Sequence, residues 1–202
     1  ELKNLAPGFA EIVDRMVNRL QTYNAGANSP DIGDPMPPFV LPNENGDLVS
    51  LDHLLESGAT VVTFHRGHWC PYCRINANAL AKIEKKLIVE GGKLVVITPE
   101  VQRYSKQLKA EAGAGFPVLT DLDCGYALQL ELAIKINDEK RDAMIHAGCD
   151  ISKFQDNDNW ILPIPATFVV GADGIVKARF VDPDYRKRME ISDLLSAVKG
   201  LA

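Results

Sequence analysis

Two continuous apolar runs flank a stretch of helical periodicity, and this arrangement constrains the fold of the 202-residue chain more than any other feature. The first run, TVVTFH, covers residues 60–65, and the second, KLVVITP, covers residues 93–99. Between them, residues 70–90 repeat apolar side chains at the spacing of an amphipathic helix. Strands that are apolar throughout are typical of a parallel sheet covered by helices. The sequence therefore predicts a strand, helix, strand crossover within an α/β fold.

The remaining patterns extend this crossover into one main domain with an N-terminal addition. Residues 6–23 have helical periodicity, and a segment rich in Gly and Pro follows them. We therefore divide the chain into a helix and linker at 1–30 and a domain at 31–202. Asn45-Gly46 predicts a small hairpin. Further predicted elements are a helix at 101–113, a strand at 116–121, a helix at 123–132, an irregular insertion at 133–162, two strands within 166–181, and a helix at 192–201 with Ser192 as its N-cap. We expect a central mixed sheet with helices on both faces.

Charge and composition exclude several classes of partner. The net charge of -5 and the pI near 5.4 leave no basic stripe for phosphates, and no window approaches the roughly eighteen apolar residues that span a bilayer. We therefore expect neither nucleic acid nor a membrane as a partner. Four cysteines are too few for a disulfide scaffold in a chain of this length. We expect a cytoplasmic protein; because the chain begins at Glu1 without a methionine, a trimmed leader stays open.

Cys70 and Cys73 are the most informative residues, because they follow a predicted strand and open a predicted helix. At a helix N-terminus, the unpaired N–H groups and the positive end of the macrodipole favour a thiolate, which is the nucleophile of thiol exchange. Pro71 suits the first helical turn and stiffens the loop between the sulfurs. The candidate supporting residues are the cations Arg66, His68 and Arg74, which lower a thiol pKa where they turn inward, and Trp69, which would shield the pair.

The cysteine pair has three interpretations: a redox-active dithiol, a metal site, or an inert pair. The spacing favours the dithiol. A zinc site would draw on His65 and His68 together with the two cysteines. These four side chains are crowded at one junction, strand alternation sends His65 to one face, and the chain holds no second Cys-x-x-Cys or His pair. We expect neither a metal nor a cofactor.

Three other residues are candidates at the same site. Pro165 starts the apolar run ATFVV, where a proline serves either as a strand's first residue or in a cis turn. Cys124 and Cys149 are single cysteines, and such residues are most often small buried hydrophobes. Either of them is also a candidate resolving thiol for the pair.

Three segments together resemble a known superfamily: FHRGHWCPYC followed by a helix, then VVITPE, then IPATFVVGADGIV. They look like the thioredoxin fold in its peroxiredoxin-like branch, and the resemblance covers about residues 31–201. DIGDPMPPFVLPNENGDLVSLDHLL is similar to the leading segment of the alkyl hydroperoxide reductase and thiol-specific antioxidant family. The resemblance implies a thioredoxin-like fold with an extra N-terminal helix and hairpin. It also implies that Pro165 is the cis-proline facing the Cys-x-x-Cys motif.

Aligning the family's sequence pattern with this chain points to two different chemistries for the cysteine pair. Typical peroxiredoxins run Phe-x-Pro-x-x-x-Thr-x-x-Cys, and laying that pattern on Phe64 puts the peroxidatic cysteine at Cys73. Cys70 then takes the threonine's place and Arg66 the proline's. The family's later arginine would fall on Pro165, so that arginine is absent. The same substitutions produce a thioredoxin-style pair, in which Cys70 attacks a disulfide and Cys73 resolves the mixed disulfide.

We expect an oxidoreductase that cycles Cys70 and Cys73 between dithiol and disulfide and reduces hydroperoxides, disulfides, or both. Its reductant would be of the thioredoxin or glutathione type. Two alternatives stay open: a thiol-disulfide oxidoreductase without peroxidase activity, and a non-enzymatic module that binds a partner through residues 133–162. A homodimer through that segment or through the N-terminal helix also stays open, because the helix's apolar face must be buried against something.

Overall fold

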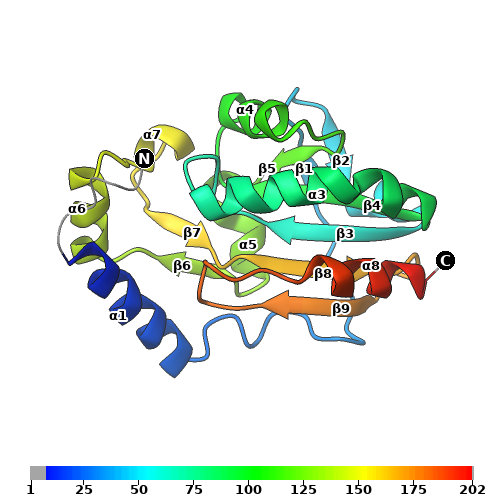
Figure 1. Ribbon diagram of the computed structural model, residues 1–202, viewed down its shortest axis with the longest axis horizontal. Coiled ribbons are helices and arrows are strands. Elements are labelled where there is room, and N and C mark those ends of the chain that lie inside the picture. The colour runs from blue at the N-terminus through cyan, green and yellow to red at the C-terminus, as the bar shows by residue number, and fades with distance from the viewer. Residues whose placement is uncertain (1–7, 202) are drawn as a thin grey trace.

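The computed structural model describes residues 8–201, and a five-stranded sheet lies at its centre (Figure 1). In chain order the elements are α1 (Phe9–Thr22), β1 (Val40–Pro42), β2 (Leu48–Ser50), α2 (Leu51–Leu55), β3 (Ala59–Phe64), α3 (Pro71–Val89), β4 (Gly92–Thr98), α4 (Gln102–Ala112), β5 (Val118–Thr120), the 3₁₀-helix η2 (Leu122–Cys124), α5 (Gly125–Gln129), β6 (Ala133–Lys135), α6 (Asp138–His146), α7 (Ser152–Gln155), β7 (Ile161–Pro163), β8 (Ala166–Val170), β9 (Val176–Val181) and α8 (Ile191–Lys199).

The central sheet has the strand order β5-β4-β3-β8-β9 and is mixed, as predicted. β3 pairs in parallel with β4, from Ala59 opposite Gly92 to Phe64 opposite Ile97. The connection between these two strands is α3, so the predicted crossover is confirmed. β8 pairs antiparallel with β3 and with β9, which gives the sheet its second half. β1 and β2 form the predicted hairpin.

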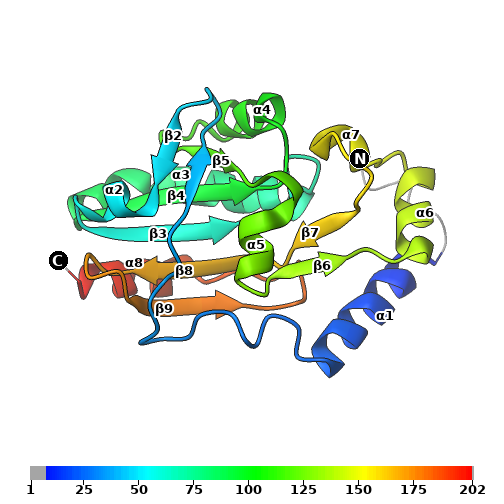
Figure 2. The same ribbon diagram turned by 180° about the vertical axis from the view of Figure 1, so that it is seen from behind.

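Helices cover both faces of the sheet, which confirms the predicted layering. α3 and α8 lie on one face, and their apolar side chains share a core with α4 (Figure 1). α2 and α5 lie on the other face (Figure 2), over a core that includes Phe64 and Phe168. These two rings are fully buried and meet edge to face with 6.4 Å between their centroids. No helix in the described part of the chain is long and apolar enough to cross a bilayer.

The helices predicted at 123–132 and 192–201 differ from those observed in the structure. The helix predicted at 123–132 is split into η2 and α5, because Asp123 and Cys124 adopt left-handed backbone conformations with φ of 58° and 57°. The last helix begins at Ile191, and Glu190 is its N-cap. Ser192 therefore lies inside the helix, and its predicted role as the cap is wrong.

The segment 133–162 is more regular than predicted. Its two ends, β6 and β7, pair antiparallel as a long-range hairpin, and α6 and α7 lie between them. Trp160 is 6% exposed and Leu162 is fully buried, so both belong to the core. Trp160 and Leu162 are therefore not available as exposed residues of a partner-binding surface on this segment.

The N-terminal helix buries its apolar face within its own chain. Met16 on α1 packs in a small core with Ile136, Met144 and Trp160, and α1 lies beside α6 (Figure 1). The predicted helix at 6–23 starts at Phe9; residues 6 and 7 lie outside the described residues. The burial of this face removes the sequence argument for a homodimer through α1.

Candidate active site

The dithiol lies at the edge of the sheet where β3 runs into α3. Gly67 turns the chain there with a φ of +136°, a conformation that side chains rarely adopt. α3 begins at Pro71, one residue after the start of the helix predicted at 70–90, and Cys70 is its N-cap. The carbonyl of Cys70 accepts hydrogen bonds of 3.1 Å from the N–H groups of Cys73 and Arg74. The first turn of α3 therefore holds both cysteines in fixed positions.

Both thiols are free and fully buried. The Cys73 Sγ accepts hydrogen bonds of 3.3 Å from the backbone N–H of Arg66 and from Nη2 of Arg188. Arg188 is anchored in turn, because its Nη1 donates to the carbonyls of Tyr185 and Lys187, at 2.6 Å each. A guanidinium group is thus held against the sulfur pair.

The two thiols share one negative charge. The hydrogen bond from the Cys73 thiol lowers the pKa of Cys70 to about 6, and the charges of Arg66 and Arg188 contribute. Burial raises the pKa of Cys73 well above its ordinary value, and a thiolate at Cys70 adds to the rise. The donors from Arg66 and Arg188 reach the sulfur of Cys73, whereas at Cys70 only the charges of these two side chains act. At neutral pH the pair is therefore a Cys70 thiolate that accepts a hydrogen bond from the Cys73 thiol.

Arg66 forms the wall of the site beside the thiols. It is only 3% exposed, and its guanidinium carbon lies 4.0 Å from the centroid of the Tyr185 ring and 5.0 Å from that of Trp69. Cation–π contacts of this kind compensate part of the cost of burying the charge. Arg66 thus contributes its backbone N–H to Cys73 and its charge to the pair, while Trp69 and Tyr185 hold it in place.

Glu100 lies on the other side of the loop that carries the thiols. It follows β4 at the carboxyl edge of the sheet and is fully buried. Its Oε2 accepts a 2.6 Å hydrogen bond from the backbone N–H of His68. A Cβ at Gly67 would lie 2.6 Å from the Glu100 carboxyl, so only glycine fits there. Burial raises the pKa of Glu100 to about 8.

His65 and His68 do not share a site, and the expected inward turn of His68 toward the thiols is not found. The imidazole of His68 turns toward Glu111, with 3.0 Å between Nε2 and the carboxylate, and Arg74 reaches the same carboxylate at 3.3 Å. His65 is fully buried, and its Nε2 lies 2.8 Å from Oδ1 of Asn76 on α3. Burial lowers the pKa of His65. His65 and His68 therefore face separate partners, and no group of His, Cys, Asp or Glu among residues 8–201 is arranged to hold a metal ion.

Pro165 precedes β8, but the expectation that it is a cis-proline is wrong. No peptide bond among the described residues is cis. The chain enters β8 as a continuation of the β6–β7 hairpin, because the N–H of Ile164 donates to the carbonyl of Leu132 at 2.7 Å. Pro165 is thus the residue directly before β8. The sequence also allowed it as the first residue of the strand, which is one position away.

The two single cysteines differ in their relation to the pair. Cys124 is buried in the core under α5, its Sγ 3.5 Å from the carbonyl oxygen of Ile161, and burial strongly raises its pKa. Cys149 is half-buried and packs in the small core that also includes Trp69 and Tyr185. Burial raises the pKa of Cys149 to about 11, and the charge of Arg66 opposes the rise. Cys149 is thus the single cysteine whose surroundings overlap those of the pair.

Several residues of this site were not found by the sequence argument. Arg188 and Tyr185 come from the segment before α8, over a hundred positions from the cysteines, and carry no local motif. Glu100 did have a signal, because it follows a strand parallel to β3, and the carboxyl ends of parallel strands meet at one edge of a sheet.

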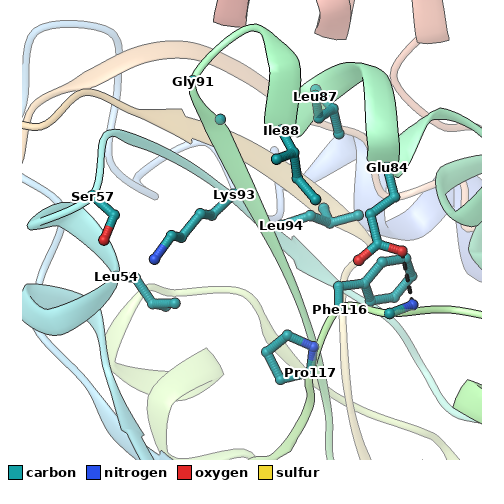
Figure 3. A pocket seen from close by; sticks show the side chains of 12 residues that line it. Leu54, Ser57, Glu84, Leu87, Ile88, Gly91, Lys93, Leu94, Phe116 and Pro117 are labelled. Atoms are coloured by element: carbon teal, nitrogen blue, oxygen red, sulfur yellow. Dashed lines mark hydrogen bonds between the residues drawn. The ribbon is translucent and has the colours of Figure 1, made fainter.

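Two hollows lie near α3, one close to the dithiol and one far from it. A cleft of about 650 Å³ opens between α3 and the segment before α8, and Tyr72, Asn76 and Arg188 are among its lining residues. A cavity of about 330 Å³ lies at the other end of α3, beside the first residues of β4 (Figure 3). Lys93 and Glu84 line it, and no cysteine does. The cleft therefore adjoins the chemistry, and the cavity does not.

Comparison with known proteins agrees with this geometry. The model of the AhpC/TSA family matches residues 32–179. No curated protein matches the chain. Among solved structures, the peroxidoxin BcpB of Mycobacterium tuberculosis has 18% identity and a TM-score of 0.67, covering 86% of this chain and 99% of its own. A cysteine-to-serine mutant of PrxQ from Xylella fastidiosa has 11% identity and a TM-score of 0.66, covering 85% and 96%. A yeast mitochondrial 1-Cys peroxiredoxin has 17% identity and a TM-score of 0.64, covering 85% and 76%. These likenesses confirm the predicted fold.

Proposed function

Because the chain belongs to the AhpC/TSA family of thiol-dependent peroxidases, we propose that it reduces hydroperoxides with Cys70 as the nucleophile and Cys73 as the resolving thiol. The observation that carries this proposal is the buried dithiol itself. Cys70 has a pKa lowered to about 6, and it is therefore mostly thiolate at neutral pH. The family resemblance expected from the sequence is confirmed, while the roles of the two sulfurs are our proposal.

The burial of both sulfurs favours a small oxidant over the disulfide of a folded protein. Cys70 and Cys73 are each 0% exposed, and Trp69 and Tyr185 pack on Arg66 beside them. A hydroperoxide is small, so it needs less rearrangement of the site to reach Cys70 than a folded protein does. A protein disulfide needs the whole motif at the surface. For this reason we place hydroperoxides first and keep thiol-disulfide exchange without peroxidase activity as the second candidate, supported by the Cys-Pro-Tyr-Cys motif.

Arg188 supports the peroxidase by supplying a cation that the sequence pattern lacks. The typical pattern places an arginine where Pro165 stands. Here the guanidinium of Arg188 reaches the sulfur pair from the segment before α8 instead. A positive charge fixed at this point stabilises the thiolate and the charge that develops on the departing oxygen. The backbone N–H of Arg66 adds a second fixed donor.

The proposed cycle has three steps. The Cys70 thiolate attacks the terminal oxygen of the hydroperoxide, the O–O bond breaks, and its electron pair leaves on the alkoxide, which takes up a proton. Cys70 is then a sulfenic acid. The Cys73 thiol attacks that sulfur, forming the disulfide and releasing water. An external dithiol, or two monothiols, restores the pair by exchange.

The electron donor is of the thioredoxin or glutathione type. One structural neighbour, the yeast mitochondrial 1-Cys peroxiredoxin, is described as resolving its thiol through the glutathione and thioredoxin systems. For this chain, the intramolecular pair supports a dithiol donor, because exchange with one dithiol returns both sulfurs in a single encounter. We also propose that the protein is cytoplasmic, which cell fractionation would test. We propose a homodimer as well, and a sedimentation experiment would measure the oligomeric state.

Turnover assays test the function directly. Purified protein is supplied with hydrogen peroxide or tert-butyl hydroperoxide, and with either a thioredoxin system or glutathione and its reductase. We expect one of these two reducing systems to consume its nicotinamide cofactor when peroxide is present. Cys70→Ser should lose this activity. Cys124→Ser, a control in the core, should keep it. Reduction of oxidised glutathione or insulin without peroxide turnover would instead establish the second candidate.

A further inference from the structure

The cavity at the C-terminal end of α3 is separate from the dithiol (Figure 3). It has a volume of about 330 Å³, which is about eleven times the volume of a water molecule in the liquid. α3 has 19 residues, and the cysteines are at its other end, so they lie about 27 Å away along the helix. A molecule bound in this cavity would therefore not touch the sulfurs.

The walls of the cavity are mostly apolar and buried. Leu54, Leu87, Leu94 and Phe116 line it, and none of them is more than 8% exposed. Ile88 lines it as well and is 60% exposed. The apolar walls thus continue to the protein surface. Such a cavity favours the apolar part of a small ligand over water.

Lys93 supplies a cation to this cavity. Its side chain is half-buried and, in Figure 3, extends toward Ser57 and Leu54. Within residues 8–201 its amine makes no hydrogen bond and no ion pair. An ammonium group has three donors and no acceptor. Lys93 is therefore available to an anionic group of a ligand.

The main chain of Leu94 adds a second donor at the cavity wall. The N–H of Val96 donates to the carbonyl of Pro117 at 3.1 Å, on the β5 side of β4. Alternate residues of a strand direct their main-chain groups to the same side, so Leu94 also faces the β5 side. β5 pairs with β4 only from Val96 onward. In the part of the chain that the structure describes, the Leu94 N–H makes no main-chain hydrogen bond on this side.

Glu84 determines the direction in which an anionic ligand would lie. Its Oε2 accepts a 2.7 Å hydrogen bond from the N–H of Gly115, and in Figure 3 its carboxylate lies beside Phe116, away from Lys93. The end of α3 also carries the negative end of the helix dipole. Both effects disfavour a second anion beside α3. The anionic group of a ligand therefore belongs at Lys93, and its apolar part belongs toward Phe116.

We propose that this cavity binds a small carboxylate with an apolar body, about ten non-hydrogen atoms in all, such as an aryl carboxylate or a short-chain fatty carboxylate. The carboxylate accepts hydrogen bonds from the Lys93 amine and the Leu94 N–H. The apolar body lies against the side chains of Leu87, Leu94 and Phe116. This binding needs neither cysteine and is independent of the peroxidase proposed above.

The test is an NMR titration of the full chain, labelled with ¹⁵N, at pH 7. Benzoate is the probe. Acetate, a carboxylate without an apolar body, and benzyl alcohol, an apolar body without a charge, are the matched controls. Lys93→Met removes the ammonium and keeps a flexible stem. Lys82→Met is the control variant, since Lys82 is an exposed lysine on α3 that does not line the cavity. No peroxide is present, so the result does not depend on peroxidase activity.

We expect benzoate to saturate one site with a dissociation constant of about 1 mM or tighter. The largest shifts should fall on the amides of Lys93, Leu94 and Gly115. Acetate and benzyl alcohol should each bind about tenfold or more weakly than benzoate, because each lacks one half of the recognition. Lys93→Met should weaken benzoate binding about tenfold or more, and Lys82→Met should bind it like wild type.

Several results would overturn the inference. Shifts that stay linear in benzoate up to about 10 mM would mean that no such site exists. Benzyl alcohol that binds as tightly as benzoate, or a Lys93→Met variant that binds benzoate like wild type, would remove the anion from the proposal. If Lys93→Met does not fold, the wild-type titrations with the three probes decide, because they need no variant.

Discussion

Replacing Lys140 by Met should stabilise the protein at low pH, because this lysine is buried and its amine makes no hydrogen bond. Lys140 lies on α6 and is 1% exposed, and its Nζ makes no hydrogen bond. The amine lies 3.5 Å from the centroid of the Phe9 ring on α1. Burial, helped by the charge of Arg66, lowers the pKa of Lys140 from 10.5 to about 7.

The sign of the effect follows from proton binding. The unfolded chain keeps the lysine proton up to about pH 10.5, whereas the folded protein releases it near pH 7. Between these values the unfolded state binds more protons, so the free energy of unfolding rises with pH. Below about pH 7 the cost of burying the cation is present in full. The shift corresponds to at most about 5 kcal/mol, and the cation–π contact returns about 1–2 kcal/mol. The net cost is about 3 kcal/mol.

Urea unfolding of the reduced protein measures this cost. Met matches the flexible stem of Lys and has a similar helix propensity. We expect Lys140→Met to be more stable than wild type by about 3 kcal/mol at pH 6, with most of the gain lost by pH 10. Lys153→Met, at an exposed lysine on α7, is the control and should change little at either pH. A gain that is equal at pH 6 and pH 10, or a loss at pH 6, would refute the reasoning.

Three further substitutions probe the site and the core. Arg188→Met removes the guanidinium from the sulfur pair, so the pKa of Cys70 should rise by about one unit. Thiolate absorbance measured as a function of pH checks this. An unchanged midpoint would mean that Arg188 has no part in the mechanism. Gly67→Ala places a Cβ against Glu100 at a φ of +136°, so it should lower the free energy of unfolding by about 2 kcal/mol or more. The control is Gly46→Ala, because Gly46 has a positive φ but open space around it, so this variant measures the cost of the positive φ alone. Phe168→Ala empties a fully buried site in the sheet and should cost about 3–5 kcal/mol in urea unfolding; a loss under about 1 kcal/mol would mean that the neighbouring core closes over the space.

The centre of the fold was predictable because its signals are local and strong. β3, α3 and β4 are long elements with clear apolar patterns, and the N-terminus of α3 places both cysteines. The β6–β7 hairpin escaped prediction because each strand has only three residues and their pairing spans the insertion between them. The helix is interrupted at Asp123 and Cys124 by their left-handed backbone conformation, and the spacing of apolar residues in the sequence does not reveal this interruption.

The chemistry of the site was predictable only in part, because some of its residues come together through contacts between distant parts of the sequence. The cysteine pair and Arg66 lie in one continuous motif, so sequence reasoning reached them. Arg188 meets the sulfur through tertiary packing, and Glu100 meets the loop across a parallel strand pair. The trans form of the bond before Pro165 likewise depends on how the chain leaves β7 for β8, which a single sequence does not reveal.

Single-turnover oxidation of Cys73→Ser and Cys70→Ser by hydrogen peroxide tests the central claim most directly. Sulfenic acid is trapped with a dimedone-type reagent and located by mass spectrometry. If Cys70 is the nucleophile, Cys73→Ser is oxidised rapidly and the trapped group is on Cys70, while Cys70→Ser reacts slowly and carries no trapped group. Rapid oxidation of Cys70→Ser with the trapped group on Cys73 would contradict the account and move the nucleophile to the position that the peroxiredoxin register gives it.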